Sequence, residues 1–163
     1  MVRWFIIILL TALQACIGIP SFLSDGGYWP RALAYSFFHG SWWHLAVNAI
    51  AVWTIYNPKR PCKPCRDLVI PYMIAVAVFP IALRPVIGFS NILYAALGMR
   101  TPSLRSRWWR QPAVIVFLAV TIAMLFIPKF SATTHIAAFL LGMAGAAASR
   151  WWITLTKDAR RYL

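Results

Sequence analysis

Residues 39–48 read His-Gly-Ser-Trp-Trp-His-Leu-Ala-Val-Asn, and they lie inside a longer run, Ala32–Pro58, that contains no charged side chain. A helix crosses a bilayer with about 20 apolar residues, so this run is long enough to form a membrane span. An unpaired polar group inside a membrane costs several kcal/mol. The presence of His39, His44 and Asn48 in one span therefore predicts that these side chains have partners or a function.

The rest of the chain has the same character. Hydrophobic residues make up 61% of the 163 residues and charged residues only 12%, far below the roughly 25% charged residues of soluble domains. We predict an all-α membrane protein, a single domain over residues 1-163 in which six transmembrane helices form a bundle. The expected spans are approximately 4-24, 37-57, 68-83, 86-99, 111-128 and 131-153.

The basic residues indicate how the spans are oriented. The net charge is +13, and with both termini in the cytoplasm only Arg31, Arg84 and Lys129 of the 16 Lys and Arg residues fall on the outer side. This is the positive-inside pattern of membrane proteins. Merging 68-83 and 86-99 into one kinked span would destroy it. We therefore expect membrane lipids with anionic headgroups as partners, and no nucleic acid.

Three expected spans bring polar residues to one depth below the outer surface. At about 1.5 Å per residue, His44 lies roughly 10 Å deep, Ser90 roughly 8 Å and His135 roughly 6 Å. Asn48 is four residues after His44, and Tyr94 is four residues after Ser90, so each pair shares a helix face. The spacing predicts one polar layer in the outer half of the bilayer.

This layer contains the parts of a nucleophilic site. A serine hydroxyl becomes a nucleophile when a base lies within hydrogen-bond reach, and the His135 imidazole is a suitable base for Ser90. No acid is expected inside a span, because all three acidic residues are assigned to loops or to the tail: Asp25, Asp67 and Asp158. We therefore predict a Ser90/His135 dyad without a carboxylate. The alternative is that these polar residues only join neighbouring helices by hydrogen bonds.

Small residues follow His135 at helical spacing. Ala138, Gly142 and Gly145 form a stripe on the same face. Small side chains allow helices to approach closely in a membrane. We expect this stripe to pack on Ala95 and Gly98 of the fourth span and so to bring Ser90 to His135.

These residues resemble the sequence motifs of the rhomboid intramembrane serine proteases, in their compact bacterial form. The segment 39–48 resembles the HxxxxHxxxN signature of the second helix, and Gly88-Phe89-Ser90 resembles the start of the GxSG motif. Tyr94 stands at the family's tyrosine position, and His135 resembles the sixth-helix histidine. Trp29-Pro30-Arg31 is similar to a Trp-Arg element of the first outer loop. GxS alone is a weak signal, but the motifs together and in this order are specific.

The resemblance implies a serine endopeptidase that cuts membrane proteins in or near their transmembrane segments, without a cofactor or metal. Ser90 is then the nucleophile and His135 the general base. His44, Asn48 and the Ser90 backbone N–H form the oxyanion hole, with Tyr94 stacked on the histidine and His39 in support. Substrates enter between the second and fifth spans. The expected location is the bacterial inner membrane, with the site toward the outer face.

Two positions depart from the family pattern. Asn91 replaces the glycine after the serine, and Ala138 replaces a glycine three residues after the histidine, whereas Gly88 and Gly142 follow the pattern. Both departures are expected to enlarge the packing surface between the fourth and sixth spans. They leave open a catalytically inactive rhomboid-like protein that binds membrane clients.

A metal site is a weaker alternative. It would use His39, His44 and His135, but the first two histidines are five residues apart and do not share a helix face. Cys62 and Cys65 form a single CxxC in a basic loop, and nothing nearby completes a four-ligand site. The role of this cysteine pair stays open.

Overall fold

The computed structural model describes residues 1–21, 28–56, 63–82, 87–100, 115, 119, 121–123 and 132–159, with side chains up to residue 151. Every regular element in these ranges is helical, which confirms the all-α prediction. The expected fifth span, 111-128, lies almost entirely outside the described residues. The elements, in chain order, are α1 (Val2–Cys16), α3 (Tyr28–Ala34), η1 (Tyr35–Phe37), α4 (Trp42–Ile55), η2 (Cys65–Val69), α5 (Ile70–Val78), η3 (Phe79–Ile81), α6 (Ser90–Arg100) and α8 (Ala132–Ala159).

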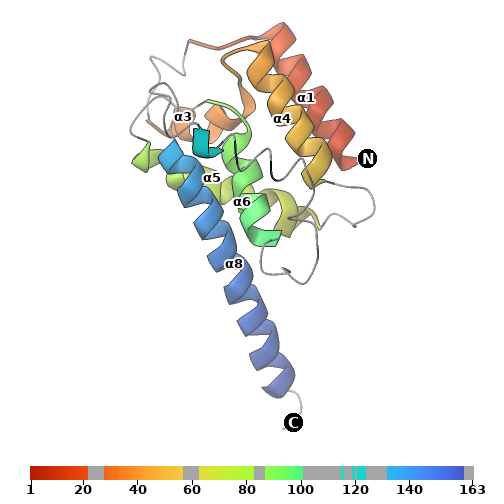
Figure 1. The fold of residues 1–163 in the computed structure, drawn as a ribbon, viewed down its shortest axis with the longest axis vertical. Coiled ribbons are helices and arrows are strands. Elements are labelled where there is room, and N and C mark those ends of the chain that lie inside the picture. Colours follow the sequence, from red (N-terminus) through yellow and green to blue (C-terminus); the bar gives the residue numbers. More distant parts are fainter. Residues whose placement is uncertain are drawn as a thin grey trace.

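Helix α6 is the centre of the bundle. Its residues from Ser90 to Gly98 are all buried, because α4, α5 and α8 pack around it (Figure 1). Leu93 and Leu97 of α6 belong to the main apolar core together with Leu10 of α1 and Val52 of α4. A helix that is apolar and buried on all sides is typical of the interior of a membrane bundle.

Helix α4 begins later than the expected span. Its first residue is Trp42, because Ser41 caps the helix and its Oγ accepts a hydrogen bond from the His44 backbone N–H at 3.1 Å. His39 therefore precedes the helix instead of lying on it. The helical spacing argument does not apply to His39, and its ring meets the His44 ring edge-on, with centroids 5.2 Å apart.

Most of the described helices are shorter than the apolar runs that contain them. Among the described residues, one helix is long and apolar enough to cross a membrane, the segment Ala132–Trp151 of α8, and α1 is a shorter apolar helix. The 15 residues of α1 extend about 22 Å, against a hydrocarbon core of about 30 Å. The helix ends at Cys16, before the turn that Gly18 makes with φ +67°. The six-span topology stays a prediction.

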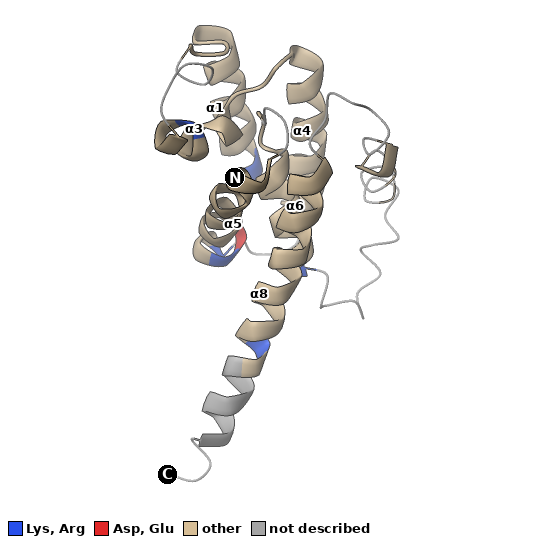
Figure 2. Ribbon diagram, turned by 90° about the vertical axis from the view of Figure 1, so that its left-hand side faces the viewer, with Lys and Arg blue, Asp and Glu red and all other residues tan. Residues whose placement is uncertain are grey.

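Three basic residues of the described part of the chain lie near the C-terminal end of α6, whereas Arg150 lies far along α8. Arg100 is the last residue of α6, Arg66 lies in η2 and Lys63 lies just before it, and all three meet at Asp67. Figure 2 shows basic and acidic residues close together at the start of the η2–α5 segment. Arg3, near the start of α1, lies over the Trp53 ring close to the end of α4, with 3.4 Å from Cζ to the centroid. Arg31 is separate from this group, because it lies in α3.

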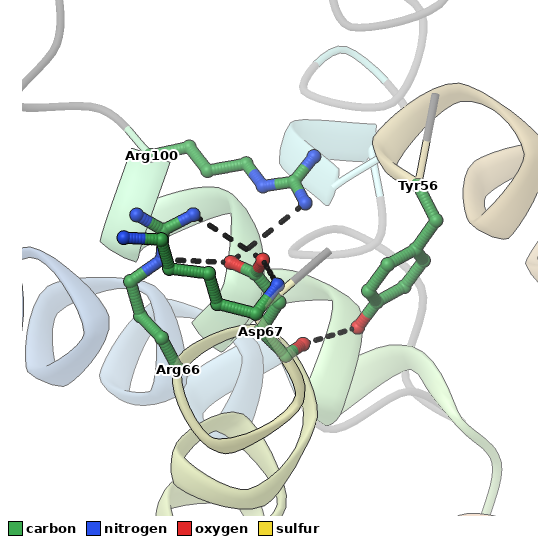
Figure 3. A network of polar contacts seen from close by, with 5 residues as sticks. Tyr56, Arg66, Asp67 and Arg100 are labelled. Carbon is green, nitrogen blue, oxygen red and sulfur yellow. Dashed lines mark hydrogen bonds and ion pairs between the residues drawn. The ribbon is translucent and has the colours of Figure 1, made fainter. Parts of the chain in front are cut away.

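An acidic residue lies buried among these basic side chains, which corrects the assignment of Asp67 to a loop. Asp67 is part of η2 and is only 3% exposed. Its carboxylate accepts hydrogen bonds from the Arg66 guanidinium (2.9 Å) and the Lys63 backbone N–H (2.8 Å), and Arg100 lies 3.9 Å away (Figure 3). The Tyr56 hydroxyl donates to the Asp67 carbonyl at 2.8 Å. The network ties the end of α4, η2 and α6 together.

Helices α6 and α8 pack with their backbones in close approach. A Cβ atom added to Gly142 would collide with the Ala95 carbonyl oxygen, and one added to Gly98 would collide with the Phe139 carbonyl oxygen. The two glycines are therefore required on opposite sides of the same interface. Gly145, also expected in the stripe, has no neighbour within 4 Å of such an atom among the described residues.

The two glycines of α8 provide a matched test of this packing. We expect Gly142→Ala to lower the free energy of unfolding by about 1–3 kcal/mol, because the methyl group forces α6 and α8 apart. Gly145→Ala should be neutral or stabilise by up to about 1 kcal/mol, since alanine favours the helix. Unfolding in detergent micelles measures both. Equal effects of the two substitutions would contradict the assigned interface.

Asp67 should make folding stability depend on acid. Burial alone raises the pKa of the Asp67 carboxyl, but the hydrogen bonds from Arg66 and Lys63 and the charge of Arg100 outweigh it and hold the pKa below its usual value. The folded state therefore gains stability above the unfolded-state pKa of about 3.9 and loses it as the pH falls further. Asp67→Asn should cost about 1–3 kcal/mol at neutral pH.

The acid dependence can be measured with unfolding curves recorded at intervals of about one pH unit between pH 3 and pH 7. The wild-type protein should lose part of its stability toward the acid end, and the Asn variant should show a flatter profile. The chain contains only three acidic residues, so few other side chains contribute to the change of the unfolding free energy at acidic pH. Parallel profiles for the two proteins would rule out the role of Asp67.

Candidate active site

The site is built around the turn that leads into α6. Gly88 has φ +117°, a conformation that side chains other than glycine rarely adopt, and its backbone N–H donates to the Tyr35 carbonyl at 2.9 Å. After this turn the chain enters the helix at once, so that Ser90 is the first residue of α6. Ser90 is 8% exposed. Its position leaves the first backbone N–H groups of α6 without acceptors inside the helix.

The hydroxyl of Ser90 and the imidazole of His135 form a hydrogen bond. Ser90 Oγ lies 2.7 Å from His135 Nε2, across the interface between α6 and α8. Both side chains are buried, and His135 lies in the first turn of α8. The close approach of the two helices at Gly98 and Gly142 thus brings together two residues that are 45 positions apart in the sequence.

Tyr94 lies beside the histidine ring. It follows Ser90 by one helical turn on α6, and its ring centroid is 4.7 Å from that of His135, with 31° between the planes. Stacked aromatic rings favour such offset arrangements. The contact limits rotation of the imidazole. His135 Nδ1 has no hydrogen-bond partner among the described residues, so the Tyr94 ring and the hydrogen bond to Ser90 hold the imidazole.

His44 and Asn48 of α4 point at the turn before Ser90. A Cβ atom on Gly88 would lie 2.5 Å from His44 Cε1 and 3.4 Å from Asn48 Nδ2, so these side chains occupy the space next to the glycine. Asn48 is 2% exposed, and its Nδ2 is a buried donor with no acceptor among the described residues. A buried donor without an acceptor beside a serine is a suitable place for a negatively charged oxygen.

His39 supports the same turn from outside α4. It is fully buried, and its Nε2 accepts a hydrogen bond from the Phe89 backbone N–H at 3.4 Å. The residue before Ser90 is therefore held by a side chain that comes from the segment between η1 and α4.

Asn91 does not lie where the sequence analysis expects it. Instead of facing α8, its side chain points toward η1, and Nδ2 donates to the Tyr35 hydroxyl at 2.9 Å. The reason is the helical angle of about 100° between successive residues, which turns Asn91 away from the His135 side of α6. Asn91 is fully buried and does not widen the α6–α8 interface. Ala138, by contrast, is fully buried in that interface, next to Tyr94 and Ala95.

Tyr35 is a residue of this site that sequence reasoning missed. It is 1% exposed and contacts the segment around Ser90 through both its carbonyl and its hydroxyl. The available signal was weak: a tyrosine hydroxyl inside an uncharged run, four residues before His39. Interfacial tyrosines are common in membrane proteins, so its type alone does not mark it.

The helical fold and the buried Ser–His pair define a class of protein, a helical bundle with a candidate serine nucleophile at a helix N-terminus. Residues 26–151 match the model of the Rhomboid domain. This match covers more than half of the chain, so the protein belongs to the rhomboid family. It is accordingly an integral membrane protein from a family of intramembrane proteases that act on membrane proteins. Searches of curated proteins and of solved structures found no match.

The fit between Gly88 and the His44 ring can be tested by adding one methyl group. We expect Gly88→Ala to cost about 1–3 kcal/mol of unfolding free energy, because the left-handed backbone becomes strained and the methyl group displaces the imidazole. Gly40→Ala is the matched control, since among the described residues its Cβ would meet Ile87 Cγ2 alone, at 3.8 Å. It should change stability by less than about 0.5 kcal/mol. Thermal unfolding in detergent compares the two, and a tolerated Gly88→Ala contradicts the geometry.

Proposed function

We propose that the protein is an intramembrane serine protease that hydrolyses a peptide bond in or near the transmembrane segment of membrane-protein substrates. The observation that carries this is the 2.7 Å hydrogen bond between Ser90 Oγ and His135 Nε2. With the ring proton on Nδ1, Nε2 accepts the hydroxyl proton as Ser90 attacks the scissile carbonyl. His135 then returns this proton to the leaving amine. Tyr94 holds the ring in the orientation that this transfer needs.

The oxyanion of the tetrahedral intermediate has donors nearby. We assign this role to His44, to Asn48 Nδ2 and to the Ser90 backbone N–H. The unpartnered Asn48 amide and the position of Ser90 at the start of α6 support the assignment. The N-terminus of a helix also carries a partial positive charge that favours an anion. Each such donor is typically worth about 3–4 kcal/mol of transition-state stabilisation.

In the topology that we propose, residues 1-163 form one domain of six spans, with both termini in the cytoplasm. The positions of four basic residues support this orientation. Arg3, Lys63, Arg66 and Arg100 lie at the ends of helices remote from Ser90, which suits the cytoplasmic side and anionic lipid headgroups. The site then lies toward the outer face, and the proposed location is the bacterial inner membrane.

The depth of the site sets a requirement on the substrate. Because a peptide carbonyl in a helix is shielded by its own hydrogen bonds, the substrate helix must unwind before the carbonyl reaches Ser90. Glycine and other helix-weakening residues near the cut reduce the cost of this step. Entry between the second and fifth spans is part of the proposal, but most of the fifth span lies outside the described residues.

The inactive, client-binding alternative rests on the two departures from the family motif. Asn91 points away from His135, and Ala138 is accommodated with the Ser90–His135 hydrogen bond intact. Neither side chain blocks the pair, so we favour the active enzyme. A fluorophosphonate that reacts only through Ser90 separates the two functions.

Removal of either member of the pair should abolish activity. In liposomes that contain a single-span substrate with a glycine in its outer half, we expect Ser90→Ala and His135→Ala to reduce cleavage by about 10³-fold or more. The control is Ser149→Ala on the exposed side of α8, where the hydroxyl donates to the Gly145 carbonyl of its own helix. It should cleave within about 2-fold of the wild-type rate. Undiminished cleavage by Ser90→Ala would disprove the mechanism.

A further inference from the structure

Tyr35 contacts the chain on both sides of Ser90. Its carbonyl accepts a hydrogen bond from the Gly88 backbone N–H at 2.9 Å, two residues before the serine. Its hydroxyl accepts one from Asn91 Nδ2 at 2.9 Å, one residue after the serine. Tyr35 and Asn91 are 1% and 0% exposed. A single buried residue of η1 thus fixes the segment that contains Ser90 at two points.

The hydroxyl of Tyr35 is itself held in one direction. It donates to the Ala75 carbonyl of α5 at 2.8 Å. A phenol has one proton to donate, so towards Asn91 it can act only as an acceptor. The amide of Asn91 must therefore present Nδ2 and not Oδ1, which fixes its orientation. The chain of hydrogen bonds runs from α6 through η1 to α5.

The position of Ser90 explains why such a restraint matters. The first turn of a helix lacks the hydrogen bonds that hold the interior, because its N–H groups have no acceptors one turn before them. A nucleophile placed there needs support from outside the helix. A displacement of about 1 Å from the productive geometry can reduce the rate of a reaction by about 10²-fold.

We propose that Tyr35 and Asn91 are positioning residues that hold Ser90 Oγ at its hydrogen-bond distance from His135. The inference rests on the proposed protease function and adds two residues that do not touch substrate. It also changes the meaning of the departure at position 91. The asparagine that replaces the glycine of the family motif holds Ser90 in place through its hydrogen bond to Tyr35.

The experiment compares the wild-type protein with Tyr35→Phe, Asn91→Ala and their double variant in the liposome cleavage assay. Each single variant should lower kcat by about 10-fold to 100-fold and leave KM within about 3-fold, because the substrate contacts are unchanged. The double variant should be no slower than the slower single variant, since both changes break the same hydrogen bond. The matched control is Tyr72→Phe, which removes another tyrosine hydroxyl bonded to a backbone carbonyl, that of Leu33 at 2.8 Å. It should keep the wild-type kcat.

A second variant separates positioning from folding. Tyr35→Phe combined with Asn91→Leu replaces both partners by apolar groups, a change that is often nearly neutral for stability. This protein should still unfold cooperatively, with a midpoint lowered only by the lost Tyr35–Ala75 hydrogen bond, yet react with a fluorophosphonate about 10-fold or more slowly at Ser90. A folded protein that reacts at the wild-type rate overturns the inference, and so does an Asn91→Ala variant with unchanged kcat. If the wild-type protein shows no Ser90-dependent labelling, the proposed function itself fails, and the inference fails with it.

Discussion

The backbone contact between α6 and α8 is the constraint on which the candidate site depends. Gly142 lies against the Ala95 carbonyl, and Gly98 lies against the Phe139 carbonyl. A larger residue at either glycine would push α6 and α8 apart and so separate Ser90 from His135. In a bilayer, where apolar side chains gain little by leaving lipid, such close packing supplies much of the association between helices. The hydrogen bond between Ser90 and His135 is the chemical result of this contact, since their distance is set by how closely the two helices approach.

Polar networks hold α6 at both of its ends. At the end that carries Arg100, the buried Asp67 carboxylate joins η2 to α6, and Tyr56 of the segment after α4 bonds to the same residue. At the end that carries Ser90, Tyr35 and Asn91 perform the equivalent task with uncharged groups. The difference suits the surroundings, because the guanidinium groups of Arg66 and Arg100 neutralise the Asp67 carboxylate, whereas a charge beside Ser90 would alter the electrostatics of the Ser90–His135 pair.

The sequence was sufficient to predict an all-helical chain and to select His44, Asn48, Tyr94 and His135 as residues that converge near Ser90, because the helical face follows from spacing, but it missed Tyr35. It could not predict the neighbour that each polar side chain meets. Asn91 bonds to a tyrosine 56 positions away, and Asp67 is buried although it follows a run of charged residues. His39 was misplaced because the capping serine at position 41 starts α4 later than hydropathy indicates. The positions of these three residues depend on contacts between segments distant in the sequence and on local helix capping. Hydrophobic periodicity contains no information about either.

The single proton of the Tyr35 hydroxyl has a consequence for how this family member can change through evolution. The hydroxyl proton already binds the Ala75 carbonyl. A residue at position 91 with only an acceptor would therefore place two buried acceptors next to each other without a proton between them. Loss of either partner alone leaves a buried polar group without its hydrogen bond. Mutational paths through such intermediates are disfavoured, so positions 35 and 91 should be inherited as a pair. In related sequences the two positions should co-vary, with phenylalanine at the first accompanying glycine or an apolar residue at the second.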